Sequence, residues 1–410
     1  MYLKGEKKLS KVVRGKYTSE AVCGFNHRTA VEEAARCLLC HDAPCSKGCP
    51  AGTDPAKFIR SIRFRNIKGA AETIRENNPL GGTCARICPY DRLCEEACSR
   101  CGIDRPIEIG KLQRYAIEQE EILEMNILEA PETVRDEKIA CIGAGPASLA
   151  CSAELAKAGY QVTVFEREEK AGGVLTYGIV PSRLPQEVVE HDIRQIEKLG
   201  VEFQFGKEVS VCELSAFDAV FLGIGLWEPK LPEIDGIHLK GVYSALEYLK
   251  EARIKKEGFE KGTKVVVVGG GDVAVDCAVT AKLLGAEEVR MVYRRTLEEA
   301  PGNMTEFQYA LSLGIGITTN MAPSALRGKE HVEFAEFKGR DGLSELKISC
   351  DTVIFAIGQR GADMGKAMEA DNVFAAGDIV NGGKTAVEAV AEGKAAAADI
   401  IKYLDMKGVK

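Results

Sequence analysis

The stretch Ile139-Ala-Cys-Ile-Gly143-Ala-Gly145-Pro-Ala-Ser148 leads from a short apolar run into a glycine-rich turn. A helical segment that ends near Lys157 follows, and then a second apolar run, Val162–Phe165. An apolar run, a glycine turn, a helix and another apolar run are typical of the strand–turn–helix–strand unit of a Rossmann-like domain. The stretch therefore predicts an α/β fold with a parallel sheet.

The same turn carries the residues that a dinucleotide requires. Gly143 permits the tight turn, and Gly145 lets the backbone approach a pyrophosphate at the N-terminus of the helix. Ser148 is small enough to keep the helix close to the strand. Glu166 ends the second strand, 21 residues after Gly145, where its carboxylate can accept hydrogen bonds from ribose hydroxyls. These residues predict a cofactor with a free ribose, either FAD or NAD.

A second copy of the unit starts with the apolar run Val265–Val268 and the turn Gly269-Gly270-Gly271-Asp272-Val273-Ala274. A helix to Leu284 and the strand Val289–Tyr293 follow, and this strand ends in Arg294-Arg295 instead of an acid. Arginine suits a 2′-phosphate, which a carboxylate would repel. The second copy therefore predicts an NADPH site; the alternative is that both arginines are a solvated strand end.

A third block completes the flavin prediction. Val373-Phe-Ala-Ala-Gly377-Asp378 is a short strand that ends in glycine and an acid, and Gly382-Gly383-Lys384-Thr385 precedes an alanine-rich helix to about Tyr403. In a Rossmann context Asp378 can reach a ribityl hydroxyl, while the N-terminus of the helix faces the pyrophosphate. The alternative is a capped strand-to-helix turn without a ligand.

Cysteines are concentrated at the N-terminus: ten of the fifteen lie in the first 101 residues. One group has the spacing C-x2-C-x4-C-x3-C-P, and the other has the spacing C-x3-C-P-x4-C-x3-C. The first resembles the bacterial ferredoxin run, in which the fourth cysteine ligates the other cluster of a pair, although its x4 interval is longer. We therefore predict two [4Fe–4S] clusters; zinc is the alternative. Spacing leaves crossed ligation and two separate sets both open. The groups are Cys37, Cys40, Cys45 and Cys49, and Cys84, Cys88, Cys94 and Cys98.

Two further expectations concern the rest of the chain. Apolar residues at three-to-four spacing predict one helix over Phe58–Asn78, which the sequence Asn77-Asn78-Pro79 ends. The cysteines outside the N-terminal region are expected in strands or helices as core residues: Cys141, Cys151, Cys212, Cys277 and Cys350.

The composition is that of a globular cytoplasmic protein. The formal charge is −7 and the pI is near 5.6, which argues against a protein that coats nucleic acid or an anionic membrane. Met1–Lys8 has no apolar segment after its charges, so we expect no signal peptide. No apolar run approaches the roughly 18 residues of a membrane span.

With these blocks in place, the chain resembles the electron-input part of dihydropyrimidine dehydrogenases and, more broadly, the small subunits of glutamate synthases. The resemblance extends from about Arg28 to Tyr403. Ser148 and Gln113 favour the first branch, because the glutamate synthase branch tends to glycine and glutamate there. The segments that carry the resemblance most closely are Cys40-His-Asp-Ala-Pro-Cys45, Gly69-Ala-Ala, Asn78-Pro-Leu-Gly81, Thr83-Cys84, Cys88-Pro89, Leu93-Cys94, Ile109-Gly-Lys-Leu-Gln113 and Gly143-Ala-Gly-Pro-Ala-Ser148.

The resemblance implies a crossed set of cluster ligands and two nucleotide sites. One cluster would be held by Cys37, Cys40, Cys45 and Cys98, and the other by Cys49, Cys88, Cys94 and the Gln113 amide oxygen. The implied flavin site comprises Gly143, Gly145, Pro146, Ala147, Ser148, Glu166, Gly172, Gly173, Val174, Arg183, Val209, Gly377, Asp378 and Thr385. The implied NAD(P)H site comprises Gly271, Asp272, Val273, Ala274, Arg294, Arg295, Ala356 and Gly358.

The implied architecture is a helical iron–sulfur domain, 1–137, followed by two Rossmann-like domains. The FAD domain is discontinuous, 138–235 and 355–410, and the NAD(P)H domain, 236–354, is inserted into it. A flavin can accept hydride and release single electrons, so we expect electrons to pass from NADPH through FAD to the two clusters. The chain has no room for a further FMN barrel, so we expect a partner subunit that binds FMN and reduces uracil or thymine. The alternative acceptors are a glutamate synthase large subunit, another FMN reductase and ferredoxin. The remaining alternative for the chain itself is a zinc-stabilised flavoprotein that is a structural or sensory partner and not an enzyme.

Overall fold

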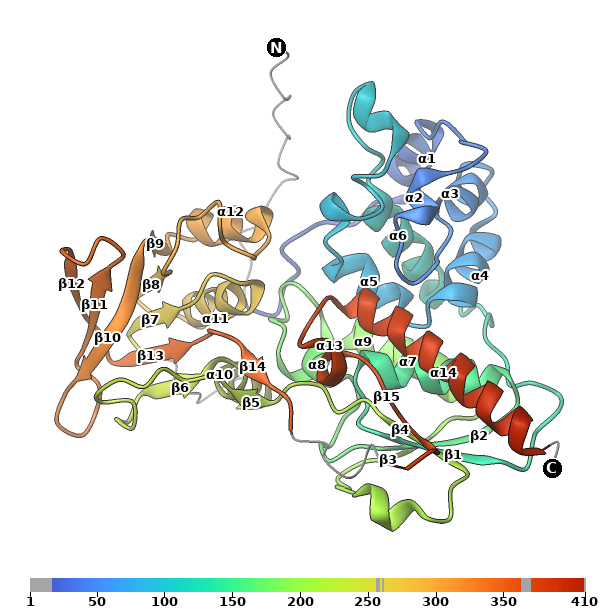
Figure 1. The fold of residues 1–410 in the computed structure, drawn as a ribbon. Helices are drawn as coiled ribbons and strands as arrows, with labels where there is room; N and C mark the ends of the chain where they lie inside the picture. The colour runs from blue at the N-terminus through green and yellow to red at the C-terminus, as the bar shows by residue number, and fades with distance from the viewer. Residues whose placement is uncertain (1–16, 256–258, 260–261, 363–369, 409–410) are drawn as a thin grey trace. The chain divides into compact units, whose positions relative to one another are not determined.

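The computed structural model describes residues 17–255, 259, 262–362 and 370–408, and its helices and strands are labelled in Figure 1. The Met1–Lys8 segment of the signal-peptide prediction lies outside these residues. The chain folds into two compact units. The larger unit contains the described residues of Gly24–Thr176, Gln186–Glu228 and Arg360–Lys410, and the smaller unit those of Met1–Cys23, Tyr177–Pro185 and Pro229–Gln359.

The N-terminal part of the larger unit is helical, as the sequence predicts. Asparagine and aspartate caps start its main helices: Asn26, Asp54 and Asn66 each accept a hydrogen bond from a backbone N–H of the first turn. Phe58, Ile62 and residues of the last helix pack into one buried core. The helices are α1 (His27–Ala35), α2 (Pro44–Lys47), α3 (Pro55–Arg63), α4 (Ile67–Asn77), α5 (Gly81–Ile87) and α6 (Ile109–Ile122), with 3-10 turns at Tyr90–Arg92 and Ser99–Gly102.

The prediction of one helix over Phe58–Asn78 is wrong, because the segment forms α3 and α4 with a break between them. Arg65 has a left-handed backbone, with φ +60°, which no α-helix accommodates. Asn66 then starts α4 by accepting a hydrogen bond from Gly69 N at 3.0 Å. A side-chain cap thus overrides the apolar periodicity.

The rest of the larger unit is a parallel five-stranded sheet in the order β15-β4-β1-β2-β3. In Figure 1, α7 and α14 lie side by side over one face of this sheet, next to the helical part. Strand β4 is buried along its whole length, as expected for a sheet inside an α/β layer. The strands are β1 (Lys138–Ile142), β2 (Gln161–Phe165), β3 (Glu202–Gln204), β4 (Ala219–Leu222) and β15 (Val373–Ala375), and the helices are α7 (Pro146–Lys157), α8 (Val174–Tyr177), α9 (Gln186–Glu197), α13 (Asp378–Asn381) and α14 (Ala386–Gly408), with a 3-10 turn at Val211–Leu214.

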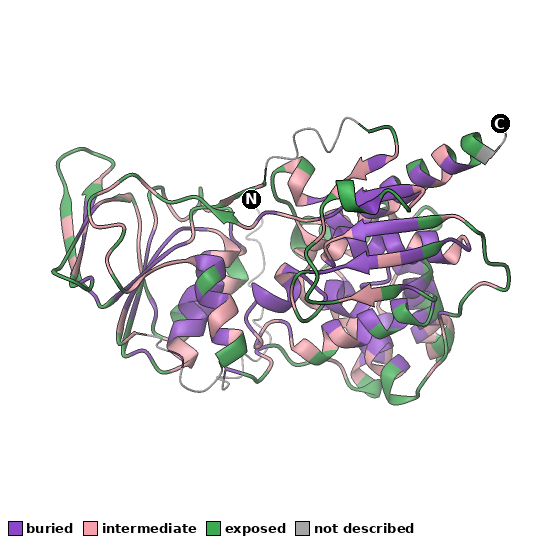
Figure 2. Cartoon of the chain, turned by 90° about the horizontal axis from the view of Figure 1, so that it is seen from below, coloured by how far each residue is buried: buried purple, intermediate pink, exposed green. Residues whose placement is uncertain are grey.

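The smaller unit repeats this design with a second parallel sheet, in the order β6-β13-β7-β8-β9, and adds an antiparallel sheet, β10-β11-β12. Figure 2 shows that burial is concentrated along the strands and on the inner sides of the helices. Its strands are β6 (Val242–Ser244), β7 (Lys264–Val268), β8 (Glu288–Val292), β9 (Gly316–Thr318), β10 (Met321–Arg327), β11 (Phe334–Gly339), β12 (Glu345–Ser349) and β13 (Thr352–Phe355), and its helices α10 (Ala245–Lys255), α11 (Asp272–Leu283) and α12 (Met304–Ser312). The short strands β5 (Glu228–Pro229) and β14 (Gln359–Arg360) pair with each other.

Both predicted strand–turn–helix–strand units are therefore present, one in each compact unit. The core prediction for the outlying cysteines holds for Cys141, Cys151 and Cys277, which are buried in β1, α7 and α11. It is wrong for Cys212, which is exposed in a 3-10 turn whose buried residue is Leu214. Cys350 is buried but lies between β12 and β13, not inside a strand.

The two compact units do not coincide with the domains expected from the sequence, whose bounds stay a prediction. The helical part and the first parallel sheet form one unit, whereas the expectation separates them at residue 137. Tyr177–Pro185 belongs to the smaller unit, although the sequence places it in the middle of the FAD domain. Among the described residues, none of the helices is sufficiently long and apolar to cross a membrane.

Candidate functional site

Four cysteines of the helical part form a first group. The thiol of Cys37 interacts electrostatically with Cys98 and Cys40, and the thiol of Cys45 interacts with Cys98 and Cys37. Cys40 Sγ lies 3.4 Å from the hydroxyl of Ser99, the residue after Cys98. Burial, reinforced by these neighbouring thiols, raises the pKa of Cys45 to about 11. Residues from the loop after α1, from α2 and from the start of the second 3-10 turn are thus brought together, and Cys98 lies near cysteines that precede it by more than fifty positions.

A second group contains Cys49, Cys84, Cys88 and Cys94. The pKa of Cys88 is raised by a hydrogen bond with Cys84 and by burial, and Cys94 and Cys49 add to the rise. Burial also raises the pKa of Cys94, with Cys49 and Cys45 among the contributing neighbours. Cys49 therefore lies near the later cysteines Cys88 and Cys94. The raised pKa values mean that these thiols are protonated in the protein without a cluster. Because ligating thiols must lose their protons, cluster binding would release these protons.

The proximity of Cys98 to Cys37 and Cys45, and of Cys49 to Cys88 and Cys94, agrees with crossed ligation, and the two ligand sets stay a prediction. The fourth position of the second group has two candidates. Cys84 is buried on α5 beside Cys88, whereas the Gln113 amide Nε2 donates to Gly81 O at 2.8 Å from the neighbouring α6. The amide oxygen is the part of Gln113 that this hydrogen bond leaves available. Which of the two side chains completes the set stays a prediction.

Single metal ions need closer convergence than these groups provide. In the described part of the chain, no three histidine, cysteine or carboxylate side chains come close enough to hold one ion. Four of these cysteines, Cys37, Cys45, Cys94 and Cys98, pack against the apolar core that contains residues of α3 and α6. A thiolate set on an apolar wall has the donor chemistry of an iron–sulfur site.

The predicted flavin turn is a cradle made of glycines. Gly143 has φ +87°, and a Cβ there would lie 2.9 Å from Gly223 O. A Cβ on Gly173 would lie 3.1 Å from the Cα of Gly145, and Gly172 N donates to Ala144 O at 2.8 Å. Three segments far apart in sequence therefore meet at backbone distance around the N-terminus of α7. Gly223 is absent from the sequence prediction, although Gly223-Ile-Gly225 directly after the apolar strand β4 is a signal that could have identified it.

The hydroxyl of Ser148 supports a ligand at this turn. Its Oγ is fully buried and has no hydrogen-bond partner within the described residues. A buried hydroxyl without a partner costs free energy unless a ligand or water supplies one. Glu166 closes the turn on the other side, because its Oε2 accepts from Ala144 N at 2.8 Å and its Oε1 accepts from Glu168 N at 2.9 Å. The donor set and the cradle thus fit a dinucleotide.

The third sequence block joins the same turn. Gly377 has φ +79°, and a Cβ there would lie 2.8 Å from the Cβ of Ala147. Burial raises the pKa of Asp378, whose Oδ1 accepts from Lys384 N at 3.1 Å. Thr385 precedes α14, and its hydroxyl donates to Glu388 at 2.6 Å. Three further predicted flavin residues belong to the larger unit. Pro146 is the first residue of α7, Val174 is the first residue of α8, and Val209 packs against the core cluster that contains residues of β4.

The predicted NAD(P)H turn lies at the start of α11 in the smaller unit. A Cβ on Gly269 would collide with Ala356 O and lie 3.0 Å from the Cβ of Ala274, so these predicted residues lie together. Gly271 is the N-cap of α11, and Val273 follows in its first turn. The Asp272 carboxylate accepts a hydrogen bond from Asn303 N at 2.7 Å, which ties the loop before α12 to the turn. Gly358 lies near β14, where its carbonyl accepts from Lys230 N at 3.0 Å.

A cavity of about 410 Å³ lies beside the predicted arginine pair. Arg294 and Arg295 line it together with Lys338 and Arg340 from β11 and the turn after it, which the sequence prediction missed. Arg340 pairs with Glu299 at 3.1 Å, whereas within the described residues Arg294, Arg295 and Lys338 have no carboxylate partner. No sequence signal could have found Lys338, because only the antiparallel sheet brings it near β8.

Arg183 is the predicted flavin residue that the structure places elsewhere. It lies in the smaller unit, where its guanidinium bonds to Asp276 at 3.0 Å and lies 3.8 Å from Glu306. Burial raises the pKa of Asp276 to about 7, although the charge of Arg183 opposes the rise. Arg183 thus binds a buried acid of α11, and its role toward the flavin stays a prediction.

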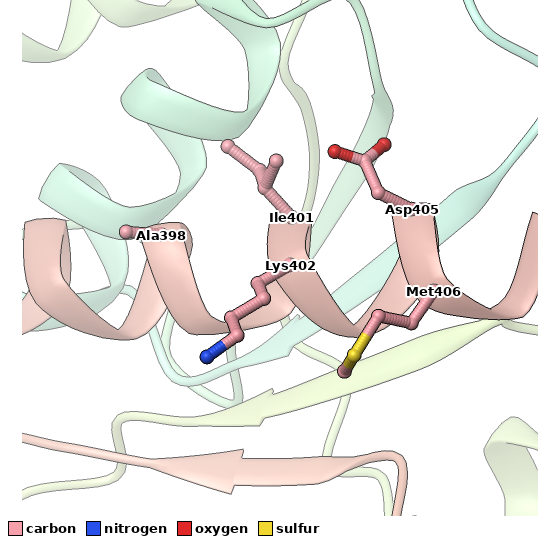
Figure 3. Close-up of a pocket in the computed structure, with 5 residues that line it drawn as sticks. All are labelled: Ala398, Ile401, Lys402, Asp405 and Met406. Carbon is pink, nitrogen blue, oxygen red and sulfur yellow. The ribbon is translucent and has the colours of Figure 1, made fainter.

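A second cavity lies on the outside of α14, where Figure 3 shows Ala398, Ile401, Lys402, Asp405 and Met406. It contains none of the predicted site residues, and its lining comes from one helix alone. We assign it no part in the site.

Comparisons with known proteins agree with this geometry. Residues 14–125 match the family described as dihydropyrimidine dehydrogenase domain II, 4Fe-4S cluster, and residues 137–393 match the pyridine nucleotide-disulphide oxidoreductase family. The chain is 43% identical to the NAD-dependent dihydropyrimidine dehydrogenase subunit PreT of Escherichia coli K12, over 95% of this chain and 98% of that protein. It is 32% identical to the glutamate synthase [NADPH] small chain of the same organism, over 93% of each.

Solved structures support the fold alone. FprA from Mycobacterium tuberculosis in complex with NADPH aligns with a TM-score of 0.58 and 18% identity, covering 67% of this chain and 86% of that one. On the strength of the relatives that match nearly its full length, the chain belongs to the family of dihydropyrimidine dehydrogenase PreT subunits and glutamate synthase small chains, which are pyridine-nucleotide-dependent oxidoreductases with an N-terminal iron–sulfur domain.

Proposed function

We propose that the chain is the electron-input subunit of a dihydropyrimidine dehydrogenase. In this role it oxidises NADPH through FAD, and two [4Fe–4S] clusters carry the electrons to an FMN-containing partner that reduces uracil or thymine at the 5,6 double bond. The observation that carries the proposal is the meeting of two cysteine groups and a glycine cradle within one compact unit. The 43% identity to a dihydropyrimidine dehydrogenase subunit supports this branch over the 32% identity to glutamate synthase small chains.

The chain's own side chains would bind and orient these groups. When bound, FAD supplies the step between two-electron and one-electron chemistry. Gly143, Gly145 and Gly173 would let the backbone lie against its pyrophosphate, Ser148 Oγ would donate or accept there, and Glu166 would orient the ribose side. The proposed ligands are Cys37, Cys40, Cys45 and Cys98 for one cluster, and Cys49, Cys88, Cys94 and Gln113 for the other.

The cationic cavity supports NADPH as the electron donor. A 2′-phosphate carries charge that Arg294, Arg295 and Lys338 could bind, and these three have no competing carboxylate among the residues that the structure describes. A 2′-hydroxyl would leave the same cations without a charged ligand. The PreT relatives are named NAD-dependent, so the use of NADPH is proposed for this chain from its own cavity.

The experiment is to purify the native complex with its partner and to supply NADPH with one acceptor at a time. The proposal expects NADPH oxidation coupled to uracil or thymine reduction, about eight irons per copy of this chain in the separated subunit, and FAD. A complex that contains FAD and the irons but does not reduce a pyrimidine would refute the choice of acceptor and leave the electron-input role standing.

A second candidate is the input subunit of a glutamate synthase. The full-length match to glutamate synthase small chains favours it, because it extends through both the cysteine region and the nucleotide folds. Glutamine with 2-oxoglutarate in the same assay decides between the two. Turnover with this pair and none with uracil would establish the second candidate.

A further inference from the structure

Lys394 of α14 reaches into the cysteine-rich part of the chain. Its ammonium donates hydrogen bonds to Ala51 O and to Asn77 O, both at 2.7 Å. Ala51 is two residues beyond Cys49 and follows Pro50. The side chain is half-buried, so the two carbonyls replace part of the water around its charge.

The residue before it touches the flavin turn. A Cβ on Gly393 would collide with Ala147 O, so α14 and the start of α7 are in direct contact there. Consecutive residues of one helix therefore contact the proposed flavin turn and the loop that carries Cys49. All of them lie in the larger unit.

A positive charge at Lys394 would act on the cluster that Cys49 is proposed to ligate. Burial lowers the pKa of Lys394 and Lys157 adds to this, whereas Glu154 and Cys49 raise it. The hydrogen bond to Ala51 O, two residues beyond Cys49, thus places the Lys394 charge within electrostatic range of Cys49. The potential of an iron–sulfur cluster depends on nearby charge and on hydrogen bonds around its ligands, and a positive charge favours the reduced, more negative cluster.

We propose that Lys394 is a positioning residue that raises the reduction potential of the cluster ligated by Cys49 and thereby favours electron transfer to it from the flavin. This rests on the proposed function, because it needs the cluster and the flavin. The cluster gains one electron, the flavin loses one, and Lys394 keeps its protons throughout. None of the relatives' names assigns a role to this lysine.

A purely structural role is the alternative, and the chain offers a matched control for it. Cations near a helix C-terminus stabilise the helix, and Lys394 contacts the last residue of α4. Lys157 makes the same kind of contact, donating to Glu76 O at 3.2 Å and Arg75 O at 3.4 Å, but among the described residues it makes no hydrogen bond to the Cys49 loop. Replacing Lys157 therefore removes a helix-end cation without removing the charge bound to Ala51.

The test is a redox titration of the purified full chain, followed by electron paramagnetic resonance, for the parent protein and for Lys394→Met, Lys394→Arg and Lys157→Met. In Lys394→Met, the one-electron equilibrium of one cluster should shift about tenfold toward the oxidised form, which is about 59 mV. The other cluster should be unchanged. Lys394→Arg should keep the parent potential, and Lys157→Met should shift it by much less.

Several results would overturn the inference. An unchanged potential in a Lys394→Met protein with its full iron content would do so, and so would an equal shift in Lys157→Met. If Lys394→Met does not retain its clusters, Lys394→Gln is titrated instead, since it is neutral and keeps an N–H donor. A parent protein without iron would refute the proposed function itself, whereas clusters that do not respond to Lys394 would refute only this inference.

Discussion

Replacing Lys338 by alanine should weaken NADPH binding and leave NADH binding nearly unchanged. Lys338 lies on β11 and shares the 410 Å³ cavity with Arg294 and Arg295. Only NADPH brings a 2′-phosphate, so a cation in this cavity discriminates between the two nucleotides. The substitution is on an exposed strand position, where it disturbs neither the buried core nor the glycine turn.

The size of the effect follows from charge and exposure. A hydrogen bond to a charged group contributes roughly 1.5–3 kcal/mol, and screening by water brings an exposed cation to the lower end. Lys338→Ala should therefore raise the dissociation constant of NADPH about tenfold. Loss of Arg294 and Arg295 together removes two such contacts and should raise it by about two orders of magnitude.

The assay is anaerobic reduction of the bound flavin by NADPH or NADH, measured by stopped-flow absorbance at several ionic strengths. Lys347→Ala is the matched control, because Lys347 lies on the neighbouring strand β12 and pairs with Glu336 at 3.6 Å, away from the cavity. The preference for NADPH should also fall as salt rises, since the Debye length shortens from about 10 Å at 0.1 M to about 3 Å at 1 M.

Equal losses with NADPH and NADH in Lys338→Ala would refute the reasoning, because they would indicate a general effect on the fold. A parent protein that binds NADH more tightly than NADPH would refute the 2′-phosphate assignment for the whole cavity. A loss in Lys347→Ala as large as in Lys338→Ala would show that any cation on this sheet has the same effect.

Three further predictions concern buried groups. Gln113→Ala should change the resonance spectrum or potential of one cluster while Cys84→Ser leaves both intact; the reverse result assigns the ligand to Cys84. Asp192→Asn leaves the buried guanidinium of Arg75 partly unpaired and should lower the free energy of unfolding by about 3–5 kcal/mol in a denaturant titration. The pKa of Asp276 is raised from 3.8 to about 7, so the folded state holds a proton that the unfolded state has lost. The contribution of Asp276 to the free energy of unfolding should therefore fall as pH rises from about 4 to about 7, by up to about 4 kcal/mol. Asp276→Asn should remove this contribution. A free energy of unfolding that rises more steeply with pH in the parent protein than in Asp276→Asn would contradict the prediction.

The sequence predicted the positions of both glycine turns, whereas the nucleotide contacts of these turns stay a prediction. Gly143, Gly145 and Ser148 could be identified locally, because the tight turn and the start of α7 follow from neighbouring residues. Gly377 shows the limit of this reasoning, since its block could be predicted as a turn but its contact with Ala147 depends on the packing of α14 on α7. Local chemistry thus predicts the parts, and packing decides which of them meet.

The features that the sequence could not predict come from tertiary contacts. Lys338 approaches Arg294 only because the antiparallel sheet follows β9. Lys394 lies in an alanine-rich helix, where a lysine is ordinarily a solvated residue, and its carbonyl acceptors lie more than three hundred positions earlier. The break between α3 and α4 was missed for the opposite reason: Asn66 is a local signal, but the apolar periodicity on both sides obscured it.

The charges buried between the helical part and the first sheet explain why these two regions form one unit. Arg75 of α4 is fully buried and bonds to Glu120 of α6 at 2.8 Å and to Asp192 of α9 at 2.6 Å. Asp192 also accepts hydrogen bonds from Gly82 N and Thr83 N, in the first turns of α5. A buried ion cluster adds little net stability, but every misaligned packing would leave a charge without its partner. The cluster therefore fixes α5, and Cys84 and Cys88 with it, relative to a helix of the flavin-type fold, and transfer of single electrons between bound groups depends on such fixed separations.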